Sequence, residues 1–154
     1  MPKLNAQYIE ICIFKFENDR VQYLLMHRTK NVNIYPGIWQ IITANIEPNE
    51  KATDTAKREI TEETGLTPTA LWVVPKVNSF YNNIDDTINF ITFFAAQAPP
   101  GSIPKLSSEH DKYEWVSLDE TQKRLVWPGQ REAVKIVSDY IIKGDVAGEV
   151  LRIF

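Results

Sequence analysis

Three glutamates, Glu59, Glu62 and Glu63, lie within five positions of one another in the segment KREITEETGL, residues 57–66. In a helix, like charges three or four residues apart repel each other by a few tenths of a kcal/mol per pair. At about 100° per residue, the three side chains share a sector of roughly 100°. Either solvent dilutes this repulsion, as on many charged helix faces, or a positive partner binds there. A hard divalent cation such as Mg²⁺ prefers oxygen ligands and is a suitable partner.

The helix that carries these glutamates is predicted from an apolar stripe with a repeat of four residues. The stripe consists of Ala52, Ala56 and Ile60. Asn49 or Glu50 is expected to cap the start of the helix. Gly65 is expected to end it in the left-handed conformation, and Pro68 prevents its continuation. The glutamates therefore lie beside the buried stripe and are accessible to a ligand.

Strands are expected on both sides of this helix. They are predicted at residues 8–16 and 21–28, which form a hairpin around the turn 17–20, and at 39–43, 70–80, 87–96 and 112–118. A second helix is predicted at 128–142. With 154 residues of which 44% are apolar, the chain can build one sizeable core. We expect a single α+β domain, residues 1–154, with a mixed-sheet sandwich.

Composition excludes some classes of partner. The net charge is −3, the pI is near 5.4 and no block of Lys or Arg occurs, which argues against binding a nucleic acid polymer. An anionic substrate would then need a cation at its site. The single cysteine, Cys12, lies between two isoleucines and predicts a buried strand position in a protein of a reducing compartment. No apolar run is long enough to span a bilayer, so we expect a soluble cytoplasmic protein.

Residues 44–66 resemble the Nudix box, G-x5-E-x7-R-E-U-x-E-E-x-G-U, in which U is a bulky aliphatic residue. Eight of the nine specified positions match: Glu50, Arg58, Glu59, Ile60, Glu62, Glu63, Gly65 and Leu66. The resemblance implies a Nudix hydrolase with an α/β/α sandwich, a mixed β-sheet and the Nudix loop-helix. The departure is Ala44, which stands where the box has its first glycine. If that glycine uses a positive φ, alanine costs on the order of 1 kcal/mol; if it allows close approach, the methyl narrows the loop.

The resemblance also implies roles for the matching residues. In the family the glutamates of the R-E-U-x-E-E core bind divalent ions, usually Mg²⁺, with Mn²⁺ as a substitute. Here these glutamates are Glu59, Glu62 and Glu63, with Glu59, Glu62 and Arg58 expected to be catalytic. Arg58 and Glu50 look like the ion pair that orients the cluster. The alternative for Arg58 is a surface pair with Glu62, four residues on.

Family members often recruit a further carboxylate from a loop outside the box, as a metal ligand or general base. Glu109 is our choice, because it lies at the end of a long loop that leads into a strand. The competing carboxylates are Asp85, Asp86, Asp111 and Glu114. The neighbouring His110 is interpreted as a bystander.

Shorter stretches outside the box suggest a substrate. IWQIITANIEPNE, EHDKYEW and WPGQREAV are similar to the bacterial dihydroneopterin triphosphate pyrophosphatases, which also hydrolyse dATP. Four aromatic residues are candidates for a wall against a pterin or purine ring: Trp39, Phe80, Tyr81 and Trp127. Arg28 is a candidate for contacting a phosphate. The expected activity is Mg²⁺-dependent hydrolysis of a diphosphate linkage in a nucleoside or pterin triphosphate by attack of water on phosphorus.

Two alternatives stay open at this point. One is a Nudix hydrolase of a nucleotide sugar or a dinucleoside polyphosphate. The other is a non-catalytic Nudix domain that binds nucleotides. The three intact glutamates argue against the second, and Ala44 argues weakly for it. A homodimer is compatible with either.

Overall fold

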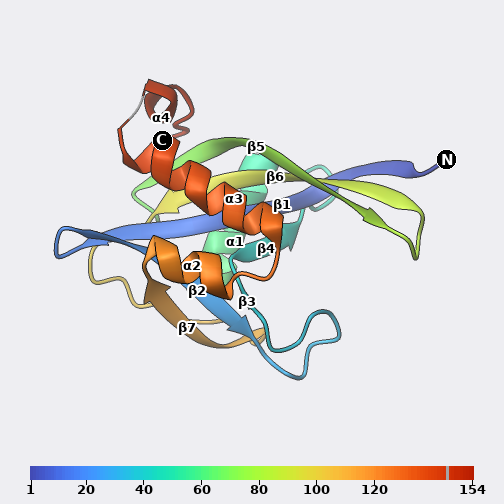
Figure 1. Ribbon diagram of the computed structural model, residues 1–154, viewed down its shortest axis with the longest axis horizontal. Coiled ribbons are helices and arrows are strands. Elements are labelled where there is room, and N and C mark those ends of the chain that lie inside the picture. The colour runs from blue at the N-terminus through green and yellow to red at the C-terminus, as the bar shows by residue number, and fades with distance from the viewer. Residues whose placement is uncertain (145) are drawn as a thin grey trace.

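The structure is a computed structural model that describes residues 1–144 and 146–154 (Figure 1). Its strands are β1 (Lys3–Glu17), β2 (Arg20–Arg28), β3 (Trp39–Gln40), β4 (Ile42–Asn45), β5 (Ala70–Asn82), β6 (Thr87–Gln97) and β7 (His110–Val116). Its helices are α1 (Ala52–Thr64), α2 (Leu118–Arg124), α3 (Pro128–Ile136), the π-helical η1 (Val137–Ile142) and α4 (Val146–Val150).

The strands form one mixed sheet. Its order is β3-β2-β1-β6-β5, with β4 also paired to β1 and β7 to β2. The β1–β6 pair is parallel and the other pairs are antiparallel. Ile11 in the middle of β1 pairs with both Ile42 of β4 and Phe94 of β6. The predicted α+β class with a mixed sheet is therefore confirmed.

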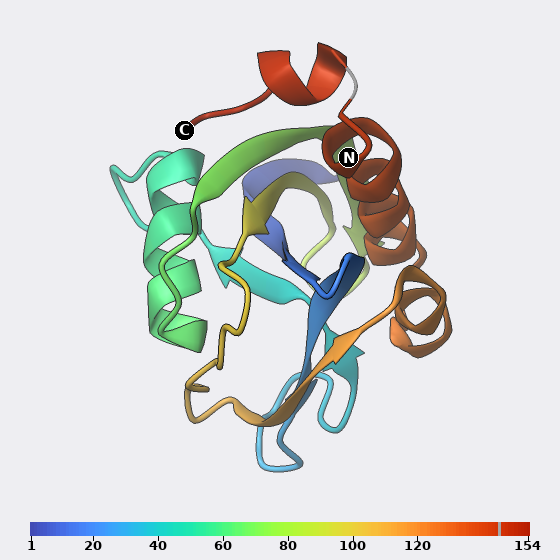
Figure 2. The same cartoon turned by 90° about the vertical axis from the view of Figure 1, so that its left-hand side faces the viewer.

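Helices cover both faces of the sheet. Figure 2 shows α1 on one side of the curled sheet, and α2, α3 and η1 on the other. Central strand β1 is consequently buried along residues 9–15. Its side chains alternate, so that Ile9, Ile11 and Ile13 join the core under α1. Cys12 and Phe14 join the core under α3, which confirms the buried strand position predicted for Cys12.

Helix α1 has the predicted body and end but a different start. Ala56 and Ile60 are fully buried, as the apolar stripe predicts. Gly65 has a φ of 64°, and its N–H donates to the carbonyl of Thr61. The predicted cap is wrong: Lys51 precedes the first turn, and no side chain caps it. The side chain of Glu50 is drawn away from the helix end, because it accepts hydrogen bonds from Thr55 and Arg58.

Several boundaries differ from the sequence prediction. The segment 39–43 contains two short strands in place of one, and they pair with different neighbours, β2 and β1. The segment 128–142 begins as α-helix and continues as π-helix after Ile136. Helix α2 was not predicted, because it has only seven residues and follows β7 almost directly. The predicted strand 112–118 includes Ser117, whose side chain in the structure caps α2 by accepting the N–H of Glu120.

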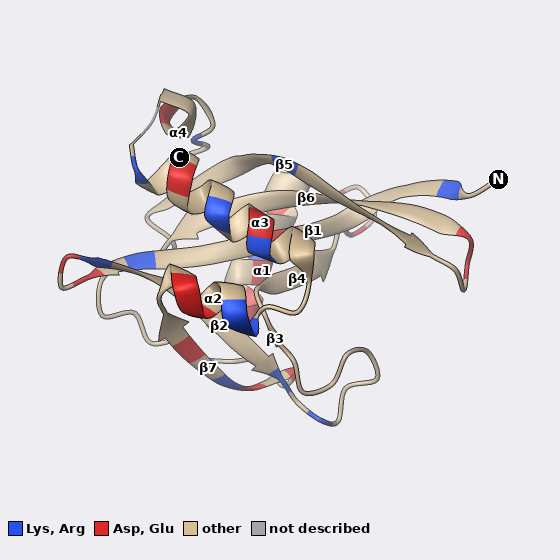
Figure 3. Ribbon diagram, viewed as in Figure 1, with Lys and Arg blue, Asp and Glu red and all other residues tan. Residues whose placement is uncertain are grey.

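Charges are interspersed over the described part of the chain. Figure 3 shows Lys and Arg next to Asp and Glu on α2 and α3, with no continuous basic stripe along either helix. Across residues 1–144 and 146–154, no helix is long and apolar enough to cross a membrane.

Candidate active site

Arg58 organises the carboxylates around α1. Its Nε and Nη2 donate to the two carboxylate oxygens of Glu50, each at 2.9 Å. Its Nη1 donates to Glu59 at 2.5 Å and to Glu62 at 3.1 Å. The structure thus contains both the expected pair with Glu50 and the alternative pair with Glu62. The forked bond to Glu50 fixes the plane of the guanidinium, which a lysine could not do.

These contacts change the acidities of the network. The hydrogen bonds from Arg58, followed by the one from Thr55, lower the pKa of Glu50 to about 2. The same bonds to Glu50 raise the pKa of Arg58. Burial raises the pKa of Glu59, and Arg58 opposes that rise. Glu50 and Arg58 therefore remain a fully ionised pair over the whole physiological pH range.

Glu63 is held by a different set of groups. The hydroxyl of Ser107 donates to Oε2 of Glu63 at 2.6 Å, and Nδ1 of His110 lies 3.2 Å from the same oxygen. The His110 ring and the Ser107 hydroxyl lower the pKa of Glu63. On the other side of the ring, Nε2 of His110 lies 3.1 Å from Nε2 of Gln40. His110, interpreted from the sequence as a bystander, therefore contacts one of the predicted metal ligands.

A loop fastened to the end of α1 brings these groups into place. The N–H of Lys105 donates to the carbonyl of Thr64 at 2.8 Å, and the N–H of Ser107 donates to the carbonyl of Glu63 at 3.3 Å. The chain then turns into β7, with the N–H of His110 within 3.4 Å of the Ser107 carbonyl. The bonds to Thr64 and Glu63 use carbonyls that the helix end leaves free.

Glu109 lies in this turn and faces Arg28. The carboxylate of Glu109 is 3.6 Å from Nη1 of Arg28, and both residues line a large cavity. The competing carboxylates have other partners or positions. Asp111 pairs with His27, Glu114 pairs with Arg124, and Asp85 and Asp86 lie in the turn between β5 and β6. Glu109 is the one of these five that lines the cavity.

The cavity has a volume of about 910 Å³, which is the size of pockets that bind small molecules. It lies between β5, the start of α3 and the loop 29–38 that follows β2. Phe80 and Tyr81 of β5 line it, together with Trp127 at the start of α3. The ring of Trp127 packs edge-on against Tyr35 of the loop, with centroids 4.9 Å apart. Three of the four predicted aromatic residues therefore meet at this cavity.

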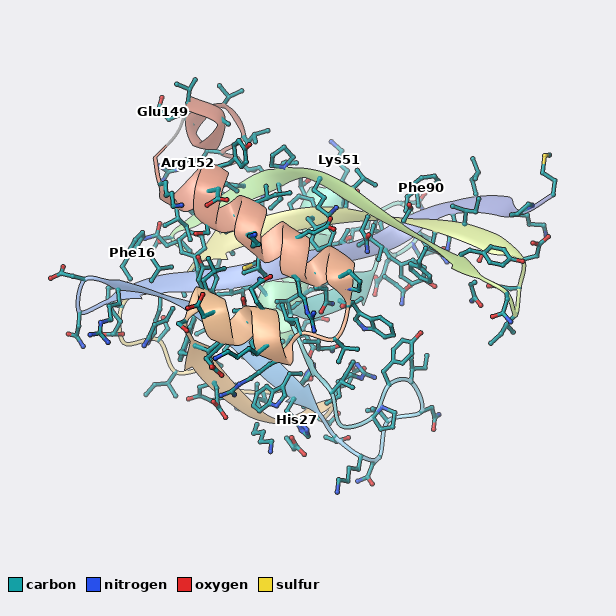
Figure 4. The ribbon with its side chains drawn as sticks, in the orientation of Figure 1. Phe16, His27, Lys51, Phe90, Glu149 and Arg152 are labelled. Atoms are coloured by element: carbon teal, nitrogen blue, oxygen red, sulfur yellow. The ribbon has the colours of Figure 1, made fainter. Side chains whose placement is uncertain are left out.

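Trp39 is not brought to the cavity. Its ring packs against His27, with centroids 5.2 Å apart, and lies under the cationic groups of Lys112 and Arg124. Figure 4 shows His27 at the edge of the molecule near β2 and β7, away from α3. Trp39 therefore lies between the sheet and α2, where it is partly buried and packs against the hydrophobic core.

Two buried polar residues at the cavity were missed by the sequence analysis. Glu10 of β1 is 4% exposed and accepts a hydrogen bond from Gln130 of α3 at 2.8 Å. Burial raises the pKa of Glu10 to about 7. The remaining oxygens, Oε2 of Glu10 and Oε1 of Gln130, have no hydrogen-bond partner among the described residues. An acidic residue inside the apolar run YIEICIF was the available signal.

Ala44, the departure from the Nudix box, lies within β4 opposite Ile9. It does not have a positive φ, and it is 8% exposed in the core under α1. The cost that a left-handed backbone would impose on alanine therefore does not arise. Ala44 also lines the cavity, so the effect that remains for its methyl group is to occupy space at the cavity wall.

The carboxylates suit a divalent ion by their chemistry and placement. Glu59, Glu62 and Glu63 supply hard oxygen donors from one turn of α1. Within the described residues no three Asp, Glu, His or Cys side chains converge at metal-binding distance. The reason lies in the contacts above: Arg58 holds Glu59 and Glu62, whereas His110 and Ser107 hold Glu63. Glu62 is 57% exposed, whereas Glu59 and Glu63 are half-buried beside it. All three side chains are carboxylates, the donors that Mg²⁺ and Mn²⁺ prefer, so the residues fit such an ion by their chemistry.

Comparison with known proteins identifies the family. A family model described as the NUDIX domain matches residues 8–136, which include α1, its carboxylates and most of the cavity. The chain belongs to the Nudix family. Nudix hydrolases generally use divalent metal ions such as Mg²⁺.

Curated relatives of this Nudix chain have several names. It is 24% identical over 108 residues to the asymmetrical bis(5′-nucleosyl)-tetraphosphatase of Mus musculus, covering 69% of this chain and 71% of that one. It is 27% identical over 105 residues to the nucleoside triphosphatase NudI of Klebsiella pneumoniae, covering 64% and 74%. A protein named octanoyltransferase from Myxococcus xanthus is 31% identical over 134 residues, 82% of this chain, but the chain spans only 35% of its length.

Solved structures show the same Nudix fold. The binary complex of a C. elegans Ap4A hydrolase has a TM-score of 0.75 at 16% identity, covering 90% of this chain and 98% of that one. The E. coli dihydroneopterin triphosphate pyrophosphohydrolase has a TM-score of 0.66 at 21% identity, covering 88% and 95%. The NUDIX domain of Shewanella oneidensis NrtR, complexed with ADP ribose, has a TM-score of 0.71 at 12% identity, covering 90% and 88%.

Proposed function

We propose that this Nudix domain is a Mg²⁺-dependent pyrophosphohydrolase that cleaves a diphosphate linkage in a nucleoside triphosphate or pterin triphosphate. The observation that carries the proposal is the carboxylate face of α1, organised by Arg58, together with a cavity that has aromatic walls and an arginine. Asn45 connects the two, because it lines the cavity and its carbonyl accepts a hydrogen bond from Arg58. The cavity suits a planar ring, and the carboxylate face suits a cation that accompanies phosphates.

In this proposal the glutamates of α1 would hold the metal, with Glu59, Glu62 and Glu63 as its ligands and Glu109 as a further ligand or general base. A bound divalent cation would neutralise phosphate oxygens and promote attack of water on phosphorus. Arg58 fixes the directions of Glu59 and Glu62 through its own anchor on Glu50.

Arg28 and the aromatic residues would bind the substrate. Nε of Arg28 donates to the carbonyl of Ile34 at 3.0 Å, and Nη1 lies 3.6 Å from Glu109. The guanidinium would bind a phosphate in the cavity. Phe80, Tyr81 and Trp127 offer flat surfaces to a purine or pterin ring. Glu109 beside Arg28 would also be near enough to the phosphates to accept a proton from water.

The closest competing activity is hydrolysis of a dinucleoside polyphosphate. It is favoured by the similarity to the mouse tetraphosphatase over 71% of that protein's length and by the fold match to the C. elegans Ap4A hydrolase. The triphosphate activity is favoured by the similarity to NudI and to the fold of the E. coli dihydroneopterin triphosphate enzyme. Phe80, Tyr81 and Trp127 line one cavity and offer a stacking surface for a ring, which supports the triphosphate.

Product analysis over a substrate panel tests the proposal. The panel comprises dNTPs, dihydroneopterin triphosphate, ADP-ribose and diadenosine polyphosphates, each with Mg²⁺, with Mn²⁺ and with chelator. We expect pyrophosphate and a monophosphate from a triphosphate, and loss of this activity with chelator and in Glu62→Gln. Preferential cleavage of diadenosine tetraphosphate would contradict the triphosphate activity and support hydrolysis of a dinucleoside polyphosphate. Nucleotide binding without turnover in either metal would favour a non-catalytic domain.

A further inference from the structure

The buried ring of His110 connects two parts of the molecule that the family motif does not connect. His110 and Gln40 are 6% and 5% exposed, and their Nε2 atoms are 3.1 Å apart. Gln40 belongs to β3, whereas His110 is the first residue of β7. Both strands pair with β2, so the contact is set by the sheet and not by a flexible loop.

The contact with Gln40 determines the tautomer of the His110 ring. An amide nitrogen donates and does not accept, so Nε2 of a neutral ring must be the acceptor. The ring proton then lies on Nδ1. Among the described residues no straight hydrogen bond reaches Nδ1, and the one carboxylate oxygen near it is Oε2 of Glu63, at 3.2 Å. That separation lies within the distance range of an N–H···O hydrogen bond.

Both contacts of Glu63 fall on the same oxygen. Ser107 and His110 approach Oε2, while the hydrogen bonds found among the described residues leave Oε1 without a donor. Two contacts on Oε2 fix the plane of the Glu63 carboxylate and leave Oε1 directed away from Ser107 and His110. Arg58 binds Glu59 and Glu62, and among the described residues it makes no hydrogen bond to Glu63.

We propose that His110 is a positioning residue for Glu63: oriented by Gln40 and assisted by Ser107, its Nδ1–H holds Oε2 so that Oε1 faces the metal. This inference rests on the proposed metal site at α1. Groups that orient metal ligands in this way commonly change metal affinity or activity by about 10- to 100-fold when removed. The role does not require any change in the protonation of His110.

The test measures Mn²⁺ affinity of the substrate-free protein by the electron paramagnetic resonance signal of the free ion. His110→Leu removes the donor and is expected to weaken binding about tenfold. His110→Asn offers an N–H close to the position of Nδ1 and is expected to restore affinity to within about threefold of wild type, whereas His110→Gln, whose amide reaches the position of Nε2, is not. The matched control is the other histidine: His27→Asn, at the surface pair with Asp111, should bind Mn²⁺ like wild type.

A double-mutant cycle separates positioning from general damage to the fold. In a Glu63→Gln background, His110→Leu should cause no further loss of affinity, because the group that it orients is already altered. An equal tenfold loss in both backgrounds, or failure of His110→Asn to restore binding, would overturn the inference. If wild type itself bound no Mn²⁺, the proposed function would fail first. If wild type bound Mn²⁺ and His110→Leu did too, with unchanged affinity, only the role of His110 would fail.

Discussion

At the scale of single residues, Arg58 shows why arginine and lysine are not equivalent in this site. Its guanidinium serves Glu50, Glu59 and Glu62 at once from one fixed plane. A lysine retains the charge but offers a single nitrogen. We expect Arg58→Lys to lower kcat at least tenfold, with a smaller change in KM, because the metal-binding carboxylates lose their orientation. Steady-state kinetics at saturating Mg²⁺ would measure this, and an unchanged kcat would show that charge alone suffices.

Ala44 leads to a prediction with two independent readouts. Because it lies in β4 without a positive φ, a glycine there would gain no backbone relief. The substitution removes a buried methyl and increases the conformational entropy of the unfolded chain. Ala44→Gly should therefore lower the free energy of unfolding by about 1 kcal/mol. The dependence of turnover on Mg²⁺ concentration should not change. A variant that is more stable than wild type, or that has a new metal requirement, would contradict this account of Ala44.

Glu10 makes stability depend on pH in an unusual direction for a carboxyl group. Burial raises its pKa from 4.5 to about 7, so the folded protein binds its proton more tightly than the unfolded chain. The stabilising contribution of Glu10 to the free energy of unfolding is complete below pH 4.5, and it is lost as the pH rises through 7. Glu10→Gln keeps the shape and removes the charge. At pH 8 it should raise the free energy of unfolding by on the order of 2 kcal/mol.

Urea unfolding at pH 8 and pH 5 would measure the effect, and the gain should shrink at pH 5. The control is Glu132→Gln on α3, where the salt bridge to Lys76 lowers the pKa of an exposed carboxyl. That variant should show no gain at pH 8. A Glu10→Gln protein that is equally destabilised at both pH values would show that the carboxylate is stabilised inside the fold by other groups.

At the scale of elements, the end of α1 is the best-defined prediction of the sequence. Gly65 has a φ of 64°, and a Cβ built there would meet only Lys105, at an ordinary 3.5 Å. The cost of Gly65→Ala is therefore a backbone cost of about 1 kcal/mol. Gly65→Asn should cost less, because asparagine tolerates the left-handed conformation better. Thermal unfolding of both variants gives the comparison, and a larger loss for asparagine would assign the cost to crowding.

Sequence patterns predicted the elements that have a strong period or a strong stop signal. The apolar stripe of α1 and its terminal Gly65 are local features, so they can be read directly from the chain. Helix α2 and the π-helical turn at Val137 could not, because seven residues give too little period and a π-turn depends on what packs against it. The cap failed for a related reason: Glu50 is satisfied by Arg58, eight residues away.

The site was predictable to the extent that it is local. The spacing of Glu59, Glu62 and Glu63 on one helix turn needs no tertiary information. The roles of Gln40 and His110 do, because they are 70 residues apart and meet only after β3 and β7 pair with β2. The same holds for the pair of Glu10 and Gln130, which are 120 residues apart.

At the scale of the whole molecule, the cavity forms where segments distant in the sequence meet. Trp127 at the start of α3, Tyr35 after β2 and Phe80 on β5 close around it. Gly129 permits this approach, since a Cβ there would lie 2.1 Å from the Asn78 side chain on β5. The position of the aromatic wall is therefore a property of the assembled fold, whereas the carboxylate face belongs to a single helix.

Trp39 and Trp127 are both candidates from the sequence for the wall against the substrate ring, but their positions in the structure predict different effects of substitution. Trp127 lines the cavity, whereas Trp39 packs beside His27 and beneath Arg124. Stacking of a base on an aromatic side chain contributes about 1–3 kcal/mol, so Trp127→Ala should raise KM roughly tenfold with kcat nearly unchanged. Trp39→Ala should leave KM unchanged and lower the melting temperature instead. Kinetics on the best triphosphate, with melting curves of both variants, would measure the contrast. An equal rise in KM for Trp39→Ala would place the substrate ring on the α2 side of the sheet, against the cavity proposed here.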